Sequence, residues 1–415
     1  MRGVEMPDVT RSAPSRSRFG QTSTPRSTQQ ITIHTDTREI LANAKRDIAR
    51  YGLDKYFIVD VDSHHVELNT WGEILEYIAD PVLRYNAKEM AKNWPHAAHL
   101  ALSNHPPGLT FQDVSGRIPH MAQLGEQVDA SGGVHRDITL VRRAMESMGI
   151  SVQIVFPQPM LEIGLHPSTE IETQLIIAYN RWFTERILAH EPRIKSMLAL
   201  PFANPDACLR VIREFAEKPG VVGFLITSQR NAALWRPEYM PVFRELEERG
   251  LPLGFHAGPD YAVGRQMNRF ISVHSISFVT CNMIHLTNWV MNAMPERFPK
   301  LKVIWMESGL AWLPFMMQRL DHEYLMRQSD APMLRRVPSE YMREMYYTSQ
   351  PMEKTNLKLL EATFEAISAE SQLLYSSDWP HWDFDTPGQI AGLPFVSEQG
   401  KRNILGETAR QLFRL

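Results

Sequence analysis

Short apolar and β-branched runs alternate with longer amphipathic stretches from residue 57 onward. Short apolar runs predict strands, whereas longer stretches with apolar residues on one face predict helices. The runs that predict strands are Phe57–Asp62, Ser151–Phe156, Lys195–Pro201, Val221–Thr227, Pro252–His256, Lys302–Glu307, Met345–Ser349 and Gln372–Ser377. Helices are predicted at Asp206–Glu217, Met240–Arg249 and Leu357–Ile367.

This alternation is typical of a parallel sheet, in which connecting helices cover one face and the strands are therefore almost continuously apolar. Residues 221–226 are such a run. With eight strand–helix units in succession, the sequence predicts an α/β fold, a (β/α)8 TIM barrel, over residues 37–415. Barrels of this kind place their catalytic residues at the C-terminal ends of the strands.

Two segments interrupt the pattern. Tyr85–Asp137, between the first helix and the second strand, is rich in Pro and Gly and predicts an insertion that forms a lid or pocket wall. Its histidines could each contact substrate, but we interpret them as ordinary polar loop residues: His96, His99, His105, His120 and His135. Residues 1–36 are rich in Ser, Thr, Pro and Arg and predict a disordered tail, with an organelle transit peptide as the alternative.

Composition narrows the class of protein. Hydrophobic residues make up 43% and charged residues 22%, as in soluble globular proteins. The net charge is −3 and no long basic run is present, which argues against nucleic acid as a partner. No apolar stretch is long enough to cross a bilayer. The two cysteines, Cys208 and Cys281, exclude a disulfide framework and fit a reducing cytoplasm. We therefore expect a cytoplasmic protein, and its partner is expected to be a small-molecule substrate.

Polar side chains end three of the predicted strands. Asp62 and His64 end the first strand and project to the same side, because strand side chains alternate, while His65 projects to the other. His256 ends the fifth strand and Asp378 the eighth. Burying these groups without a partner would be costly. Two carboxylates and two imidazoles suit one divalent ion, Zn²⁺, Mn²⁺ or Fe²⁺.

Three further residues could support this site or hold a second metal ion. Glu307 ends the sixth strand and could activate water, although a glutamate paired with an arginine is the alternative. His285 could face the site together with Glu307 and His274, or be an ordinary core or surface histidine. Glu67 could be a ligand or could cap the first helix.

Two residues after the eighth strand are predicted to contact the substrate. Trp379 and His381 follow Asp378 on the catalytic rim of the barrel. Aromatic side chains at this position would suit a flat organic substrate.

The chain resembles the amidohydrolase superfamily, in particular its amidohydrolase 2 or aminocarboxymuconate-semialdehyde decarboxylase-like branch. The resemblance covers most of residues 57–400 and includes the segments Tyr179–Trp182, Glu191–Arg193, Glu296–Val303 and Glu307–Pro314. It implies that His64, His256 and Asp378 bind the metal, and that two chains could form a homodimer. The family usually has His where Asp62 stands, and its decarboxylases have a catalytic His where Glu307 stands.

Asp in place of the usual His at position 62 favours Mn²⁺ or Fe²⁺ over Zn²⁺ as the bound ion. Because Glu307 stands where the family's decarboxylases have a catalytic His, we predict that the enzyme is a metal-dependent hydrolase. In this hypothesis a metal-activated water attacks an amide, ester, lactone or thioester. Asp378 takes the proton from that water, and Glu307 is the second catalytic residue, which could help to activate the water. The alternative is decarboxylation of an aromatic or dienoic acid, with Asp378 giving a proton to carbon and Arg230 or Arg265 holding the substrate. A catalytically silent barrel is a third hypothesis.

Overall fold

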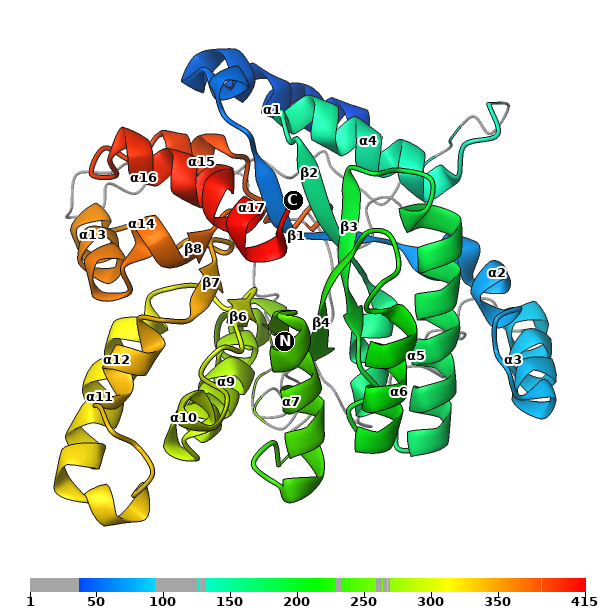
Figure 1. The fold of residues 1–415 in the computed structure, drawn as a ribbon. Coiled ribbons are helices and arrows are strands. Elements are labelled where there is room, and N and C mark those ends of the chain that lie inside the picture. The colour runs from blue at the N-terminus through cyan, green and yellow to red at the C-terminus, as the bar shows by residue number, and fades with distance from the viewer. Residues whose placement is uncertain are drawn as a thin grey trace, which may run out of the picture.

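The structure is a computed structural model that describes residues 37–93, 126, 128, 132–227, 233–258, 263, 267, 269–381 and 383–415. Within these residues, eight parallel strands form one sheet in the order β1 to β8 (Figure 1). The strands are β1 (Val59–His65), β2 (Val152–Pro157), β3 (Ile194–Ala199), β4 (Val221–Thr227), β5 (Leu253–His256), β6 (Val303–Met306), β7 (Tyr346–Thr348) and β8 (Leu373–Leu374). Each lies within or overlaps a predicted run, and the prediction of a (β/α)8 barrel is confirmed.

The first and last strands close the barrel just beyond the end of β8. Asp378 donates its backbone N–H to the carbonyl of Asp62 at 2.8 Å, and His64 donates to the carbonyl of Trp379 at 2.7 Å. Ser63 and Trp379 form a parallel bridge between these segments. The closure therefore brings the predicted ligands of the first and eighth strands together.

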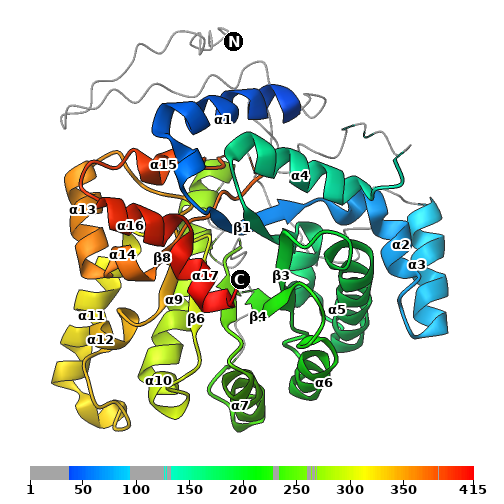
Figure 2. The same ribbon diagram turned by 45° about the horizontal axis from the view of Figure 1, so that its top comes forward.

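Helices connect the strands around the outside of the barrel (Figure 2). The helix α1 (Thr37–Tyr51) precedes β1 and packs along α4. The connections are α2 (Trp71–Leu75), α3 (Pro81–Asn93) and α4 (Arg136–Met148) before β2, α5 (Thr169–Phe183) before β3, α6 (Pro205–Phe215) before β4, α7 (Met240–Arg249) before β5, α9 (Phe270–Met291) and α10 (Met294–Arg297) before β6, α11 (Trp312–Met326) and α12 (Pro338–Met342) before β7, and α13 (Leu357–Ala366) and α14 (Ala369–Gln372) before β8. After β8 come α15 (Gly388–Ala391), α16 (Glu398–Arg402) and α17 (Thr408–Phe413).

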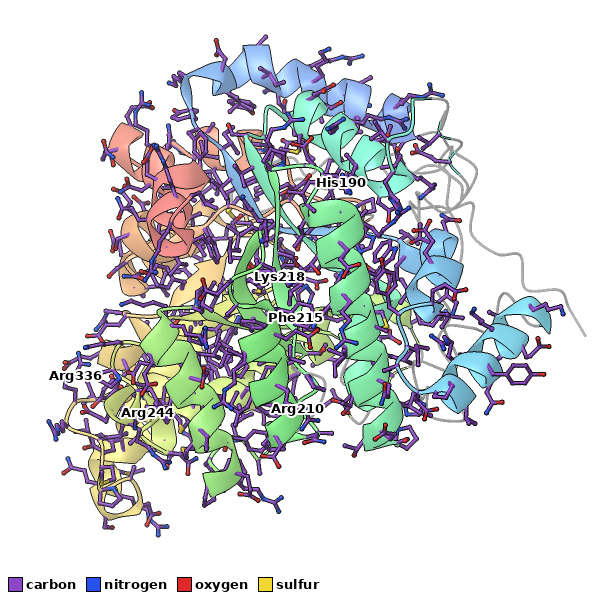
Figure 3. All side chains as sticks on the ribbon, turned by 45° about the vertical axis from the view of Figure 1, so that its right-hand side comes forward. His190, Arg210, Phe215, Lys218, Arg244 and Arg336 are labelled. Carbon is purple, nitrogen blue, oxygen red and sulfur yellow. The ribbon has the colours of Figure 1, made fainter. Side chains whose placement is uncertain are left out.

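The sequence pattern of α6 explains why it packs on the barrel. Asn204 begins the helix by accepting a hydrogen bond from the backbone N–H of Ala207 at 3.1 Å, as an N-cap does. Phe215 is buried on the side that faces the sheet, whereas Arg210, and Lys218 just beyond the helix, are exposed (Figure 3). A helix with one apolar and one charged face gains stability by covering a strand with the apolar face.

The barrel interior is narrow, and glycines in β4 and β5 make room for methionines. A Cβ atom at Gly223 would lie 2.9 Å from the Cε atom of Met197. At Gly254 it would lie 3.1 Å from the Sδ atom of Met306. Because side chains alternate along a strand, His256 projects to the same inner side as Gly254.

Several predictions from the sequence fall outside the described residues. These are the tail at 1–36, most of the insertion with His96, His99, His105 and His120, and the two candidate arginines Arg230 and Arg265. The described ends of the insertion are helical: α3 begins before its start, and His135 caps α4 by accepting from the backbone N–H of Asp137 at 3.2 Å. Across the described part of the chain, no helix combines the length and apolar character needed to cross a membrane.

Candidate metal centre

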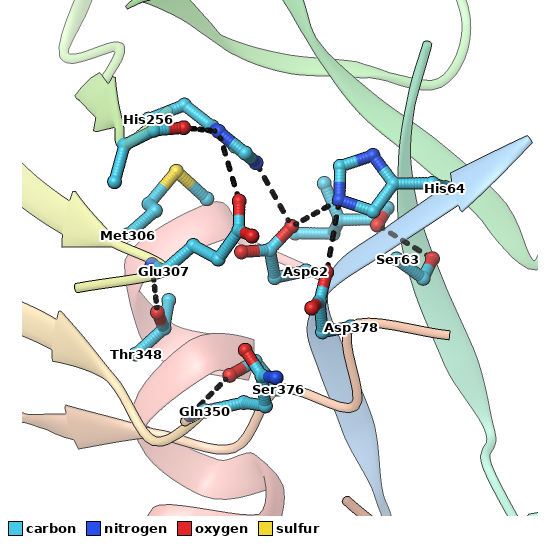
Figure 4. A network of polar contacts seen from close by, with 12 residues as sticks. Asp62, Ser63, His64, His256, Met306, Glu307, Thr348, Gln350, Ser376 and Asp378 are labelled. Carbon is cyan, nitrogen blue, oxygen red and sulfur yellow. Dashed lines mark hydrogen bonds and ion pairs between the residues drawn. The ribbon is translucent and has the colours of Figure 1, made fainter. Parts of the chain in front are cut away.

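Side chains from β1, β5 and the segment after β8 converge at the C-terminal end of the barrel (Figure 4). The Nε2 atom of His64 lies 3.5 Å from Oδ1 of Asp62 and 3.1 Å from Oδ1 of Asp378. The Nε2 atom of His256 lies 3.3 Å from the same Oδ1 of Asp62. The structure therefore brings together the four side chains that the sequence predicts as ligands.

Both imidazoles are oriented by backbone carbonyl groups. The Nδ1 atom of His64 lies 3.3 Å from the carbonyl oxygen of Pro157, and that of His256 lies 2.7 Å from the carbonyl oxygen of Ala257. An N–H group at Nδ1 satisfies each carbonyl and leaves the lone pair on Nε2. This arrangement is common for histidines that bind metal ions through Nε2.

The donor set has the chemistry that a divalent ion requires. Asp62, His64 and Asp378 are each at most 2% exposed. Within the described residues, Oδ2 of Asp62 and Nε2 of His64 have no hydrogen-bond partner. Buried polar atoms without partners are costly, and clustered carboxylates repel one another. A cation bound among these atoms would remove both costs, so the residues fit a divalent metal ion.

The protonation of the cluster is consistent with such a site. Burial lowers the pKa of His64 to about 4, so this imidazole is neutral as a ligand must be. Burial also lowers the pKa of His256, but Asp62 and then Glu307 outweigh burial and raise it to about 9. Burial, followed by the negative charge of Glu307, raises the pKa of Asp378 well above its ordinary value. Without a metal the cluster therefore holds extra protons, which a bound cation would displace.

His381 joins this cluster, although its predicted role was substrate contact. Its Nδ1 atom lies 2.7 Å from Oδ1 of Asp378, and its ring stacks on that of His64 at 4.4 Å between centroids. Its Nε2 atom contacts the side-chain oxygen of Gln158. The ligand atoms of His64, Asp378 and His381 lie within 4.8 Å of one another, as do those of Asp62, His64 and His256. His381 could therefore be a further metal ligand.

A turn brings His381 to this position. The backbone N–H of His381 donates to the carbonyl of Asp378 at 2.8 Å, which is an i to i+3 turn. The spacing of Asp and His around Trp379 and Pro380 was the signal in the sequence that could have identified the pair.

Two carboxylate residues have left-handed backbone conformations. Glu307 has φ of 52° and Asp378 has φ of 59°. Such conformations cost a non-glycine residue about 1–3 kcal/mol and persist where the surroundings impose them, often at functional sites. The backbone N–H of Glu307 donates to Oγ1 of Thr348 at 3.1 Å, and its carboxyl oxygen lies 3.5 Å from Nδ1 of His256. Glu307, which directly follows β6, therefore faces the cluster of proposed metal ligands.

Glu67 contacts the segment that follows β2. Its two carboxyl oxygens accept the backbone N–H groups of Gln158 at 2.9 Å and Met160 at 2.6 Å. Glu67 therefore holds the segment after β2 in place, rather than capping the helix that follows it. Since Gln158 contacts His381, this support extends to the metal cluster.

His285 and Trp379 are buried among other rings. His285 is on α9 and its ring lies 5.7 Å from that of Phe255, which projects to the outer side of β5, opposite to His256. Trp379 is 2% exposed and packs edge-on against Phe384 at 4.8 Å. His285 does not belong to the two groups of ligand atoms found among the described residues, and the contact of Trp379 with substrate stays a prediction.

Comparison with known proteins gives the family of this chain. The model of the Amidohydrolase family, Amidohydro_2, matches residues 143–415, about two thirds of the chain. The chain belongs to the Amidohydrolase family. It is therefore an enzyme of the amidohydrolase superfamily, as the sequence predicted.

Individual relatives of this amidohydrolase are decarboxylases. The gamma-resorcylate decarboxylase of Polaromonas sp. (strain JS666 / ATCC BAA-500) is 23% identical over 285 residues, which cover 66% of this chain and 86% of the relative. The 5-carboxyvanillate decarboxylase of Sphingomonas paucimobilis has a similar structure, with a TM-score of 0.61, 19% identity and coverage of 87% of this chain and 100% of that one. A dihydroxybenzoic acid decarboxylase of Polaromonas sp. JS666, with bound manganese and the inhibitor 2-nitroresorcinol, has a TM-score of 0.58, 18% identity and coverage of 87% and 97%.

These comparisons contradict one prediction from the sequence. Hydrolysis was predicted as the main reaction, largely because Glu307 stands where family decarboxylases have a histidine. The relatives are decarboxylases of hydroxylated aromatic acids, which favours the alternative reaction.

Proposed function

We propose that this amidohydrolase is a metal-dependent decarboxylase of a hydroxylated aromatic acid. The observation that carries the proposal is the placement of Asp62, His64, His256 and Asp378 in two groups of ligand atoms that share His64, in the fold of decarboxylases of this kind. A divalent ion bound there would supply the positive charge that holds the substrate carboxylate and a neighbouring oxygen. Mn²⁺ is our first choice, because it accepts both carboxylate and imidazole ligands and several similar structures contain it.

Asp378 and Glu307 are the groups that we propose for proton transfer. Decarboxylation breaks the bond between the ring carbon and the carboxylate, and the electron pair stays on that carbon until it accepts a proton. Burial raises the pKa of both carboxyl groups well above the ordinary range. Without the ion, each can therefore hold a proton near neutral pH. With the ion bound, Asp378 would give up its proton as a ligand, whereas Glu307, which is not one of the four proposed ligands, can keep its proton and give it to the ring carbon as CO₂ leaves.

The cavity beside the cluster suits a flat substrate. It has a volume of about 600 Å³ and is lined by Glu307 together with the rings of Phe278 and Trp312. Pockets for small organic ligands have volumes of this order and mostly apolar walls with a few polar groups. An aromatic ring would lie against these side chains with its carboxylate toward the metal cluster.

The proposal is tested by CO₂ release. Protein loaded with Mn²⁺ would be incubated in D₂O with a panel of 2-hydroxybenzoates, and both CO₂ and the position of deuterium in the product would be measured. We expect CO₂ and one deuterium on the carbon that carried the carboxylate, with a loss of about 100-fold or more in Asp378→Asn. Full activity of Asp378→Asn, or no CO₂ from any member of the panel, would contradict the proposal.

A further inference from the structure

The cavity beside Glu307 has a wall built from several elements. Helix α9 contributes one side, and the segments after β6, β7 and β8 contribute the others. Its polar groups determine which substituents of a bound ring can be accommodated, because a buried polar group requires a partner in the complex.

Nearly all the polar side chains in the described part of this wall already have a protein partner. Ser275 donates to the carbonyl of Ile271, Ser308 accepts from Asn282, Trp312 donates to the carbonyl of Gly309, Glu353 accepts from the backbone of Leu310, His274 lies 3.7 Å from Asp383, and Glu307 lies 3.5 Å from His256. These contacts fix the wall and reduce its capacity to bind a ligand.

Gln350 is the exception in the described wall. It is 1% exposed, and neither Oε1 nor Nε2 of its side chain has a hydrogen-bond partner among the described residues. Its backbone N–H donates to Oγ of Ser376 at 2.9 Å, two residues before Asp378 in the chain (Figure 4). A buried amide without partners destabilises a protein by about 1–3 kcal/mol per group. A ligand that bonds to this amide would remove that cost.

The charge of the wall limits the chemistry of that ligand. Three carboxyl groups line the cavity, those of Glu307, Glu353 and Asp383, and its described part contains neither Lys nor Arg. A second carboxylate on the ring would face the negative charges of Glu353 and Asp383, and protonated Glu307 supplies no compensating cation. An uncharged hydroxyl can both donate to Oε1 and accept from Nε2 of the Gln350 amide.

We propose that Gln350 binds a hydroxyl substituent on the ring of the aromatic acid, and that the acidic wall excludes a second carboxylate. This inference rests on the proposed function, because that function places an aromatic acid in the cavity. It narrows the substrate class to monocarboxylic acids that carry, besides the hydroxyl next to the carboxylate, a further hydroxyl within reach of Gln350.

Binding of unreactive analogues tests this assignment without turnover. A nitro group has the shape of a carboxylate but cannot leave as CO₂, so the reference ligand is 2-nitrophenol. Calorimetry would compare it with the four isomers that add one hydroxyl at a free ring position and the four that add one carboxylate there, using full-length protein loaded with Mn²⁺. The variants are Gln350→Met, which has a similar volume and no hydrogen-bonding amide, and Ser275→Ala as a control in the same wall.

We expect one hydroxylated isomer to bind about tenfold more tightly than 2-nitrophenol to the wild type and to Ser275→Ala, with this gain lost in Gln350→Met. We also expect every added carboxylate to weaken binding, and Gln350→Met to melt at or above the wild-type temperature. An equal gain in Gln350→Met, no gain in the wild type, or tighter binding of a dicarboxylate analogue would overturn the assignment. Any of these results would leave the proposed function standing, because that function is tested separately by CO₂ release.

Discussion

The carboxylate of Asp60 holds Ser377 through both of its oxygens. Oδ1 accepts the backbone N–H of Ser377 at 2.8 Å, and Oδ2 accepts its hydroxyl at 2.6 Å. Gln153 donates to Oδ2 at 2.8 Å, and all three side chains are buried. Since Ser377 immediately precedes Asp378 and Asp60 lies two residues before Asp62, this contact fixes the spacing of two proposed ligands.

Replacing Asp60 by Asn should therefore weaken the metal site without touching it directly. The amide can accept at one atom only, so at least one of the donors that face the carboxylate loses its partner. We expect stability to fall by about 1–3 kcal/mol and metal affinity to fall by about 10- to 100-fold. Urea unfolding and titration with Mn²⁺ would measure these changes. Asp54→Asn at an exposed position is the control, and an unchanged metal affinity in Asp60→Asn would contradict the positioning role.

Replacing Glu307 by Gln should lower the rate of decarboxylation without weakening metal binding. The amide keeps the shape of the side chain beside His256 but cannot give up a proton. We expect kcat for CO₂ release to fall by about 100-fold while Mn²⁺ binds within about threefold of the wild-type affinity. Glu353→Gln, in the same cavity wall, should leave kcat almost unchanged. Wild-type kcat in Glu307→Gln would exclude the proton-transfer role.

Replacing Tyr179 by Phe should destabilise the outer side of β1. The Tyr179 hydroxyl lies 2.8 Å from Nε2 of His65, whose Nδ1 lies 3.0 Å from Asp137, and all three residues are buried. Loss of the hydroxyl leaves one imidazole nitrogen without a partner, which costs about 1–3 kcal/mol. Thermal unfolding would show this loss, and Tyr85→Phe on the exposed face of α3 should show none. Equal stability of the two variants would contradict the role of this network.

The acid sensitivity of the fold should depend in part on Glu191. Burial raises the pKa of this carboxyl group, but hydrogen bonds from Arg193 and then Arg142 outweigh burial and lower it to about 2. A lowered pKa stabilises the fold above the ordinary pKa of 4.5, and this stability is lost as pH falls toward 2. Because both arginines are partly exposed, we expect about 1–2 kcal/mol.

Urea unfolding between pH 7 and pH 2 tests this expectation. Glu191→Gln should be less stable than the wild type at pH 7, and the difference should vanish near pH 2. The control is Glu361→Gln, at an exposed position on α13, which should follow the wild type at every pH. A difference for Glu191→Gln that does not change with pH would contradict the assigned pKa.

The barrel and its four proposed metal ligands could be predicted from the sequence for a definite physical reason. Parallel strands alternate with helices at a regular spacing, and their C-terminal ends meet on one face. A polar residue after a long apolar run, such as His256, was therefore informative without any knowledge of the fold in three dimensions. The prediction that His65 projects away from Asp62 and His64 is confirmed by its contacts with Asp137 and Tyr179.

Other contacts could not be predicted because they depend on the path of the backbone between elements. His381 reaches Asp378 through a tight turn, and Glu67 reaches the backbone beyond β2, 91 residues away. His285 lies on the outer side of β5 because of the rotation of α9, which the local pattern does not specify. The pairing of two chains, and the treatment of residues 37–415 as one domain, stay predictions.

The central claim is that one divalent ion binds among Asp62, His64, His256 and Asp378. Crystals grown with Mn²⁺ and 2-nitroresorcinol would locate the ion by its anomalous scattering. We expect one strong peak within about 2.0–2.4 Å of a donor atom of each of these four side chains, with Nε2 as the donor of both histidines. Anomalous density elsewhere, or none in protein that is saturated with Mn²⁺, would contradict the account.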